Sequence, residues 1–215
     1  MKKNQIYIKC GTDYTAMTRE LLETCDLAGE IRKKKESFAD ISDQMGVLGE
    51  DALHDMRIGI KPNLVAPMEA YWGGTTHPEV AAGIVEYLQE RGFFNLVIME
   101  GSWVGDKTSE SYEVCGYKSL CEKYRVPFLD MQKEKGVSVE CGDMTLNICK
   151  SVLDLDFLIN VPVLKGHCQT KITCALKNMK GLLPNSEKRR FHALGLHDPI
   201  AHLGLGIHQD FIVVD

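Results

Sequence analysis

A cluster of cationic side chains between residues 160 and 192 is the part of this sequence best suited to chemistry. The stretch holds seven lysines and arginines and one acid, a net charge of +6, whereas the whole chain of 215 residues has a formal net charge of −5. A local excess of positive charge on an acidic protein favours an anion, such as a phosphate, a carboxylate or an acidic partner. His167 and His192 lie in the same stretch and could transfer protons.

Two short motifs within this stretch combine charge with proton transfer. Lys165 and His167 lie two residues apart in an extended turn, where together they could bind an anion and move a proton. Lys177, Asn178 and Lys180 follow, and in a helical turn the two lysines would face the same side. Burial and mutual repulsion would then lower the pKa of one lysine, which would make it a base or a nucleophile.

Further polar residues come directly after apolar segments that are typical of buried strands. Lys61 and Asn63 follow one such segment, and Glu100 and Ser102 follow the next. Because ligands of open α/β sheets bind beyond the carboxyl ends of the strands, we expect these side chains to lie near Lys165. Glu100 is a candidate general base, metal ligand or partner of a lysine.

A turn containing two glycines leads into the start of a helix at Pro78. Thr76 and Glu79 match the capping-box pattern, and Pro78 suits a first turn because its missing N–H removes no hydrogen bond there. Free N–H groups and the helix dipole favour an anion at such a site, so Thr76 is a candidate anion ligand. His77 is a candidate second proton carrier or metal ligand. The glycine spacings of a P-loop and of a dinucleotide-binding fold are both absent.

The predicted site is therefore drawn from distant parts of the chain. Its catalytic candidates are His167, Lys165, Glu100 and His77. Its anion-binding candidates are Lys61, Asn63, Thr76, Ser102, Lys177, Asn178, Lys180 and His192. The alternative for each lysine is an ordinary solvated surface position, and for Glu100 it is a simple ion pair.

The cysteines and histidines leave the cofactor undetermined. None of the eight cysteines belongs to a CxxC pair, so neither a zinc ribbon nor an iron–sulfur run is present. A divalent metal is an alternative that the sequence leaves open. Free thiols, together with the absence of a signal peptide at the N-terminus, indicate a cytoplasmic protein.

Composition argues against two classes of partner. No apolar run approaches the roughly 20 residues needed to cross a bilayer, so no membrane association is expected. The pI of about 5.8 argues against a general nucleic-acid binder, which usually has a strongly basic domain.

Apolar segments alternate with helical patterns along the chain, which predicts an α/β protein. We expect strands over 6–10, 56–60, 94–99, 126–130, 155–161 and 211–214, helices over 14–25, 78–91, 117–124 and 198–208, a loop over 42–51, and a β-hairpin over 137–149. Such alternation favours three layers: a mostly parallel sheet with helices on both faces and the hairpin as an insertion. We expect a single domain over 1–215, and the end directly after a strand is consistent with a missing C-terminal piece.

Several blocks of the sequence resemble the domain-of-unknown-function family 362. They are KPNLV (61–65), TTHPEV (75–80), EGS (100–102), GYKSLCEKYRV (116–126), LINVPVLKGH (158–167), ALKNMKGLLP (175–184) and FH (191–192). The resemblance implies an α/β domain that is often joined to a ferredoxin-like module carrying four-iron four-sulfur clusters, and hence a ferredoxin-like redox partner. A looser similarity to lactate-racemase-type proteins, which bind a nickel cofactor, concerns only the fold and the lysine and histidine content.

Three functions follow as alternatives. The first is an enzyme, or part of one, that binds a small anionic substrate bearing a phosphate or carboxylate through the Lys/His cluster. The second is an iron–sulfur-linked redox accessory protein. The third is a non-catalytic binding module with a basic docking face.

Overall fold

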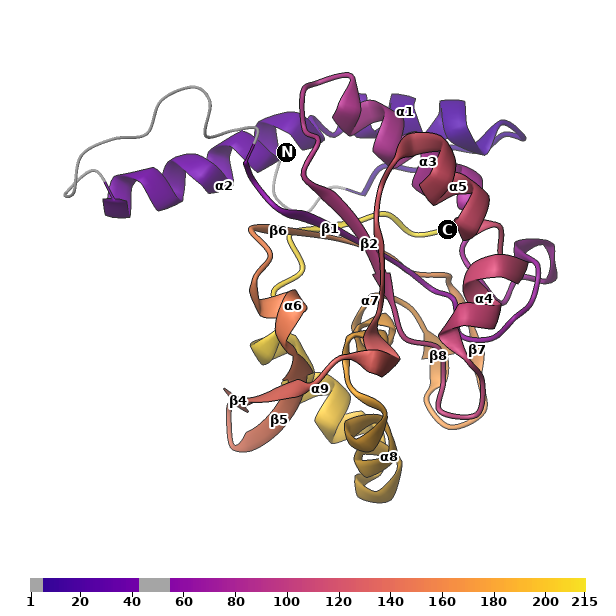
Figure 1. Cartoon of the computed structure of the whole chain (residues 1–215), viewed down its shortest axis with the longest axis vertical. Helices are drawn as coiled ribbons and strands as arrows, with labels where there is room; N and C mark the ends of the chain where they lie inside the picture. The colour runs from indigo at the N-terminus through magenta and orange to yellow at the C-terminus, as the bar shows by residue number, and fades with distance from the viewer. Residues whose placement is uncertain (1–5, 43–54) are drawn as a thin grey trace.

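A five-stranded parallel sheet runs through the centre of the molecule (Figure 1). The computed structural model describes residues 6–42 and 55–215. The strands are β1 (Ile58–Pro62), β2 (Leu96–Glu100), β3 (Phe128–Asp130), β6 (Phe157–Val161) and β9 (Phe211–Ile212), in the order β3-β2-β1-β6-β9. Ile60 of β1 pairs with Ile98 on one side and Ile159 on the other. Strands β1, β2 and β6 are buried along their whole length, as expected where both faces of a sheet are covered.

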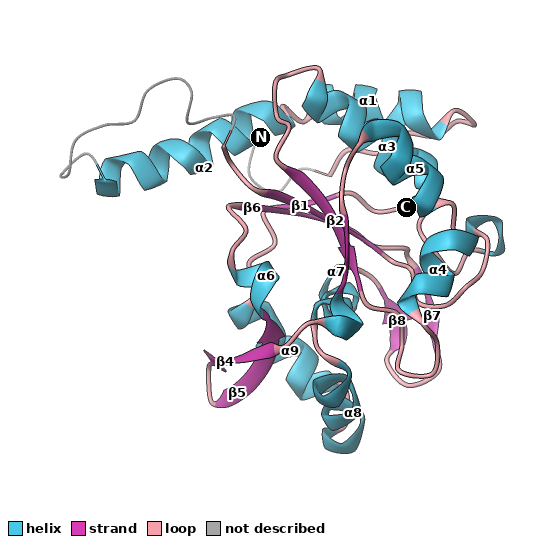
Figure 2. Cartoon of the chain, in the orientation of Figure 1, coloured by secondary structure: helices cyan, strands magenta, loops and turns pink. Residues whose placement is uncertain are grey.

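Four helices cover one face of the sheet, and Figure 2 shows α1, α3 and α5 together on this side. They are α1 (Tyr14–Thr24), α2 (Leu27–Ser42), α3 (Pro78–Gln89) and α5 (Tyr117–Tyr124). Leu22, Ile84 and Leu120 from these helices belong to one apolar cluster with Ile60 and Ile159 of the sheet. The shorter α4 (Thr108–Val114) precedes α5.

The opposite face carries a β-hairpin and the C-terminal helices. These are β4 (Gly136–Cys141) and β5 (Met144–Cys149), α6 (Lys150–Leu153), α7 (Ala175–Asn178), the 3-10 turn η5 (Met179–Leu182), α8 (Asn185–Leu194) and α9 (His197–Gly206). A second apolar cluster joins Met99 and Leu158 of the sheet to Ile148, Phe191 and Leu203 of this layer. The three-layer α/β prediction is therefore confirmed.

A small second hairpin and two further 3-10 turns complete the described elements. The hairpin is β7 (Lys165–His167) with β8 (Lys171–Thr173), and the turns are η3 (Ala70–Trp72) and η4 (Met131–Lys133). Among the described residues no helix combines the length and the apolar character needed to cross a bilayer.

Two local predictions are wrong. Residues 6–10 form no strand, and Ile6 and Ile8 are largely exposed, because no neighbouring strand accepts their alternating pattern. The capping box also fails to form: His77 is the N-cap of α3, and the Thr76 hydroxyl donates to the carbonyl of Val161 instead. The loop expected over 42–51 lies, apart from its first residue, outside the described residues.

Candidate functional site

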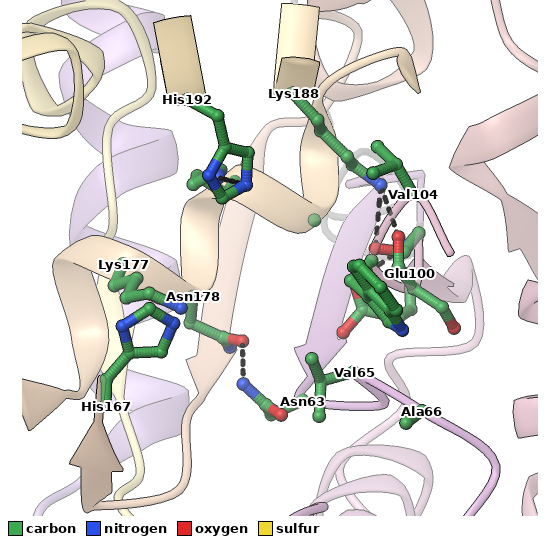
Figure 3. Close-up of a pocket in the computed structure, with 15 residues that line it drawn as sticks. Asn63, Val65, Ala66, Glu100, Val104, His167, Lys177, Asn178, Lys188 and His192 are labelled. Carbon is green, nitrogen blue, oxygen red and sulfur yellow. Dashed lines mark hydrogen bonds between the residues drawn. The ribbon is translucent and has the colours of Figure 1, made fainter. Parts of the chain in front are cut away.

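A cavity of about 390 Å³ lies beyond the carboxyl ends of β1 and β2 (Figure 3). The loops after these two strands form part of its wall, and β7, α7, η5 and α8 form the remainder. The lining residues are Asn63, Val65, Ala66, Glu100, Gly101, Ser102, Trp103, Val104, His167, Lys177, Asn178, Lys180, Gly181, Lys188 and His192. In Figure 3, His167, Lys177 and Asn178 lie on one side, and Lys188, Val104 and Glu100 lie on the other.

Positive charge dominates the lining. Three of the lining residues are lysines, and Glu100 is the one carboxylate among them. That carboxylate already has a cation, because its Oε2 lies 2.8 Å from the Nζ of Lys61. The lysines of the cavity therefore have no free carboxylate in the described lining to balance them.

The Lys61–Glu100 pair is a buried ion pair that supports the floor of the cavity. The side chain of Lys61 is fully buried, and its Nζ donates to the Pro62 carbonyl at 2.6 Å, to Glu100 Oε2 at 2.8 Å and to Asn178 Oδ1 at 3.1 Å. Burial lowers the pKa of Lys61, and the charge of Glu100 opposes that shift. Glu100 also accepts from the backbone N–H groups of Leu64 at 2.8 Å and of Gly101 at 2.7 Å.

Three hydrogen-bonded amides extend this support across the cavity. Asn63 Nδ2 donates to Asn178 Oδ1 at 2.9 Å, and Asn178 Nδ2 donates to Asn160 Oδ1 at 2.7 Å. Lys165 Nζ donates to Asn63 Oδ1 at 2.9 Å and to the carbonyl of Gly74. Lys165 therefore holds the amide network in place from behind the lining and is not part of the lining itself.

Two glycines allow the wall to close on the ion pair. A Cβ at Gly181 would lie 1.9 Å from Glu100 Oε1 and 2.7 Å from Lys61 Nζ. A Cβ at Gly101 would lie 2.5 Å from Lys188 Nζ and 2.8 Å from the Gly181 carbonyl oxygen. Only glycine fits at these two positions while β2 and η5 stay this close.

The lysines around the cavity hold their protons weakly. Burial is the largest cause in each case, and it lowers the pKa of Lys165, Lys180 and Lys188 to about 8. Repulsion by the Lys177 ammonium lowers the pKa of Lys165 and of Lys180 further, whereas the charge of Glu100 opposes the effect of burial on the pKa of Lys188. The pKa of Lys177 is itself lowered, again mainly by burial. Lys188 donates to the carbonyls of Gly101 at 2.8 Å and Ser102 at 2.9 Å.

The two histidines of the lining present different faces to it. His167 Nδ1 accepts from the backbone N–H groups of Gln169 and Thr170, both at 3.1 Å, so the neutral ring carries its proton on Nε2. His192 Nε2 lies 3.2 Å from Lys180 Nζ. Partial burial, followed by repulsion from nearby lysines, lowers the pKa of both imidazoles. Both are therefore neutral near pH 7, His167 as a donor and His192 as an acceptor from Lys180.

One side of the cavity is apolar. Val65, Ala66 and Val104 line it, together with the half-exposed ring of Trp103. Gly105 lies against that ring, since a Cβ there would lie 2.1 Å from one of the ring carbons. The cavity thus joins a cationic surface to a hydrophobic one.

Three predicted site residues have structural partners. His77 Nδ1 lies 3.0 Å from Asp215 Oδ2, and its ring lies 4.6 Å from that of Tyr14, away from the cavity lining. Thr76 bridges the backbones of two strand ends and is also outside the lining. Ser102 lines the cavity, but its hydroxyl is hydrogen-bonded to the Leu64 carbonyl at 2.7 Å and to the Ser111 hydroxyl at 2.8 Å.

The structure brings most of the predicted side chains together. The predicted residues that line the cavity are Asn63, Glu100, Ser102, His167, Lys177, Asn178, Lys180 and His192. Lys61 and Lys165 contact this group from behind, and Thr76 and His77 do not reach the cavity. The roles assigned to these residues remain predictions.

Sequence reasoning missed Lys188 and the apolar wall. Lys188 lies in a run of three basic residues, a pattern typical of a solvated surface. Helical spacing was the available signal, because Phe191 and His192 follow it by three and four residues and therefore share its face. Phe191 is fully buried, so that face of α8 points inward.

No ready metal centre is visible in residues 6–42 and 55–215. In these ranges no three His, Cys, Asp or Glu side chains gather closely enough to hold an ion. All eight cysteines are free thiols, and Cys10 and Cys168 are the exposed ones.

The fold and the cavity define a parallel α/β protein with a cationic ligand pocket at the ends of its strands. The chain belongs to the family described as Domain of unknown function (DUF362), whose model matches residues 58–215. A curated relative, a thylakoid-associated protein of Synechocystis sp., is 26% identical over 156 residues, which cover 73% of this chain and 48% of the relative. The chain thus spans about half the length of that relative. All residues that line the cavity lie within the matched range.

Proposed function

We propose that the cavity binds a small anionic molecule bearing a phosphate or carboxylate, and that the chain is an enzyme, or part of one, that acts on it. The observation that carries the proposal is the set of three lysines, Lys177, Lys180 and Lys188, around one cavity of about 390 Å³. The volume is within the range of roughly 300–1,000 Å³ typical of small-molecule sites.

Electrostatics gives the physical reason. Burial disfavours the charged form of these lysines, and repulsion by Lys177 and Lys188 adds to this effect at Lys180, so holding the lysines charged costs free energy. An anion among them would relieve the repulsion and raise each pKa toward its ordinary value. Binding near pH 8 should therefore be accompanied by proton uptake.

The other lining groups have complementary roles in this proposal. The Nε2–H of His167 would donate a hydrogen bond to the anion, and His192 would move a proton to or from Lys180. Glu100 would act as a support for Lys61 and not as a base, because its oxygens are occupied by Lys61 and by backbone N–H groups.

Calorimetric titration with inorganic phosphate, pyrophosphate and citrate tests the proposal. The informative comparison is Lys188→Met against Arg189→Met, because each removes one positive charge from α8. Lys188 is buried at the cavity, whereas the neighbouring Arg189 is exposed. We expect Lys188→Met and Lys177→Met to weaken binding of the best anion by about tenfold or more, which corresponds to about 1.4 kcal/mol.

Arg189→Met should leave that affinity within about twofold, since the exposed charge is screened by solvent. Equal losses in Lys188→Met and Arg189→Met would favour a basic docking face, and no binding of any of the three anions would refute the proposal. The iron–sulfur-linked function and a cytoplasmic location remain predictions. Iron and sulfide analysis after anaerobic purification tests the former.

A further inference from the structure

Lys180 differs from Lys61, Lys165 and Lys188 in what its amine contacts, and it differs from the lining lysine Lys177 in lying beside His192. Lys61, Lys165 and Lys188 each donate to two or more oxygen acceptors of the protein. In the described part of the chain no carboxylate lies within ion-pair distance of Lys180. Its Nζ lies 3.2 Å from His192 Nε2 and 5.8 Å from the centre of the Phe191 ring. The amine thus faces the cavity beside a base.

The neighbours of Lys180 favour the unprotonated amine. Its pKa is lowered to about 8, first by burial and then by the charges of Lys177 and Lys188. Roughly a tenth of the molecules then carry the free amine at pH 7, compared with far less than a hundredth for an ordinary lysine. The lone pair of a free amine is a nucleophile toward carbonyl carbon.

The remaining groups of the cavity select the carbonyl compound. Lys177 and Lys188 supply positive charge for a carboxylate next to the reacting carbonyl. Val65, Val104 and Trp103 supply an apolar surface for the rest of the molecule. These features together fit a 2-oxo acid, in which a ketone lies directly beside a carboxylate.

We propose that the Lys180 amine forms an imine with the ketone carbon of a 2-oxo acid bound in this cavity, an inference that rests on the proposed anion-binding function. The amine lone pair forms the C–N bond, and the π electron pair of the C=O bond moves to the oxygen. His192 carries the first nitrogen proton to this oxygen, which gives a carbinolamine with a hydroxyl group. His192 then takes the second nitrogen proton and delivers it to the hydroxyl as the C–O bond breaks and the C=N bond forms. Water leaves, and no oxidant or reductant is required.

Reductive trapping tests this step on the wild-type chain. The protein is incubated with pyruvate or phenylpyruvate at pH 8, reduced with cyanoborohydride, digested and analysed by mass spectrometry. Reduction of the imine adds the mass of the 2-oxo acid less one oxygen atom to the modified lysine. We expect this adduct on Lys180 and not on the exposed Lys118 or Lys171, and we expect phenylpyruvate to label at a lower concentration than pyruvate because of the apolar wall.

Matched variants separate the amine from its charge and from its base. Lys180→Arg keeps a positive charge but has no amine that can form an imine, so it should lose the adduct. His192→Asn should slow labelling of Lys180 by about a hundredfold, the usual lower range for loss of a general base, whereas His197→Asn on the exposed start of α9 should not. The labelling rate of the wild type should also rise with pH through about 8, following the amine of Lys180.

The outcomes distinguish this inference from the anion-binding proposal. Phosphate binding without an adduct on Lys180 from either 2-oxo acid would overturn the imine and leave anion binding intact. Equal labelling of Lys180 and exposed lysines would also overturn it, because the cavity would then add nothing to ordinary amine reactivity. Selective labelling of Lys180 supports it, whatever the affinity for phosphate.

Discussion

Replacing Lys61 with methionine should destabilise the fold strongly, because it leaves Glu100 charged and buried. Both side chains are almost fully buried and lie 2.8 Å apart. Removing one member of a buried ion pair typically costs about 3–5 kcal/mol. Glu100 keeps its bonds from the backbone N–H groups of Leu64 and Gly101, so we expect about 3 kcal/mol for Lys61→Met. That is a large share of the roughly 5–15 kcal/mol that stabilises a typical domain.

Urea unfolding followed by far-UV circular dichroism measures this effect. The set comprises Lys61→Met, Glu100→Gln and the double variant. Each single change leaves one buried group without its partner, whereas the double change removes both charges together. The double variant should therefore be more stable than the sum of the single effects predicts, by about 1–3 kcal/mol. A loss below about 1 kcal/mol in Lys61→Met, or strict additivity, would refute the reasoning.

The same variants test whether Lys61 only supports Glu100 or also contacts the bound anion. Lys61→Met leaves the negative charge of Glu100 uncompensated at the cavity and should weaken phosphate binding. The double variant removes both charges, and Lys61 is not part of the lining. The affinity of the double variant for phosphate should therefore return to within about threefold of the wild type. Loss of binding in the double variant would indicate that the ammonium of Lys61 itself contacts the anion.

Three further predictions concern packing, pH and proton uptake. Gly181→Ala should lower the free energy of unfolding by about 2–3 kcal/mol, because its Cβ would lie 1.9 Å from a Glu100 oxygen. At Gly204 the nearest atom is 3.6 Å away, so Gly204→Ala should be neutral or stabilising. The folded pKa of about 8 for Lys180 and Lys188 lies below the value of about 10.4 in an unfolded chain. Between these values the unfolded state holds more protons, so the contribution of these lysines to the stability of the ligand-free protein should rise with pH. The double change Lys180→Met/Lys188→Met should flatten that rise. Phosphate titrations at pH 8 in buffers of different ionisation enthalpy should reveal proton uptake, and identical heats in all buffers would contradict it.

The central strands and several helices could be predicted because their signals are local. Strands β1, β2 and β6 are short, mostly apolar runs with one polar residue at or next to the last position. The Gly142 turn marks the β4–β5 hairpin with its φ of +71°. The alternating residues 6–10 carry a similar local signal, but a strand requires a hydrogen-bonded neighbour. The sequence does not say whether such a neighbour is present.

The charged network of the site could be predicted only in part, because burial depends on distant partners. Lys61 looks like a surface lysine at a strand end, and its partner Glu100 lies 39 positions further along the chain. The sequence allowed Glu100 to be the partner of a lysine, but it could not say that this lysine is Lys61 or that both side chains are buried. The burial of Lys188 could not be predicted for a similar reason. Its hydrogen-bond acceptors are backbone carbonyls, which every residue carries, so no residue type in the sequence indicates them.

The two apolar clusters lie on opposite faces of one sheet, and α8, which lines the cavity, packs into only one of them. The loop ends of β1 and β2 form one rim, and η5 and α8, from the second cluster, form the other. Layers that share only a sheet can open separately, each with its own free energy of local unfolding. A bound ligand would contact both α8 and the strand ends, so it would hold α8 in place and slow amide hydrogen exchange in this helix. Amide exchange in the helices on the opposite face of the sheet would change little on binding. Exchange in α8 would therefore report occupancy of the cavity, and exchange in those helices would serve as an internal reference.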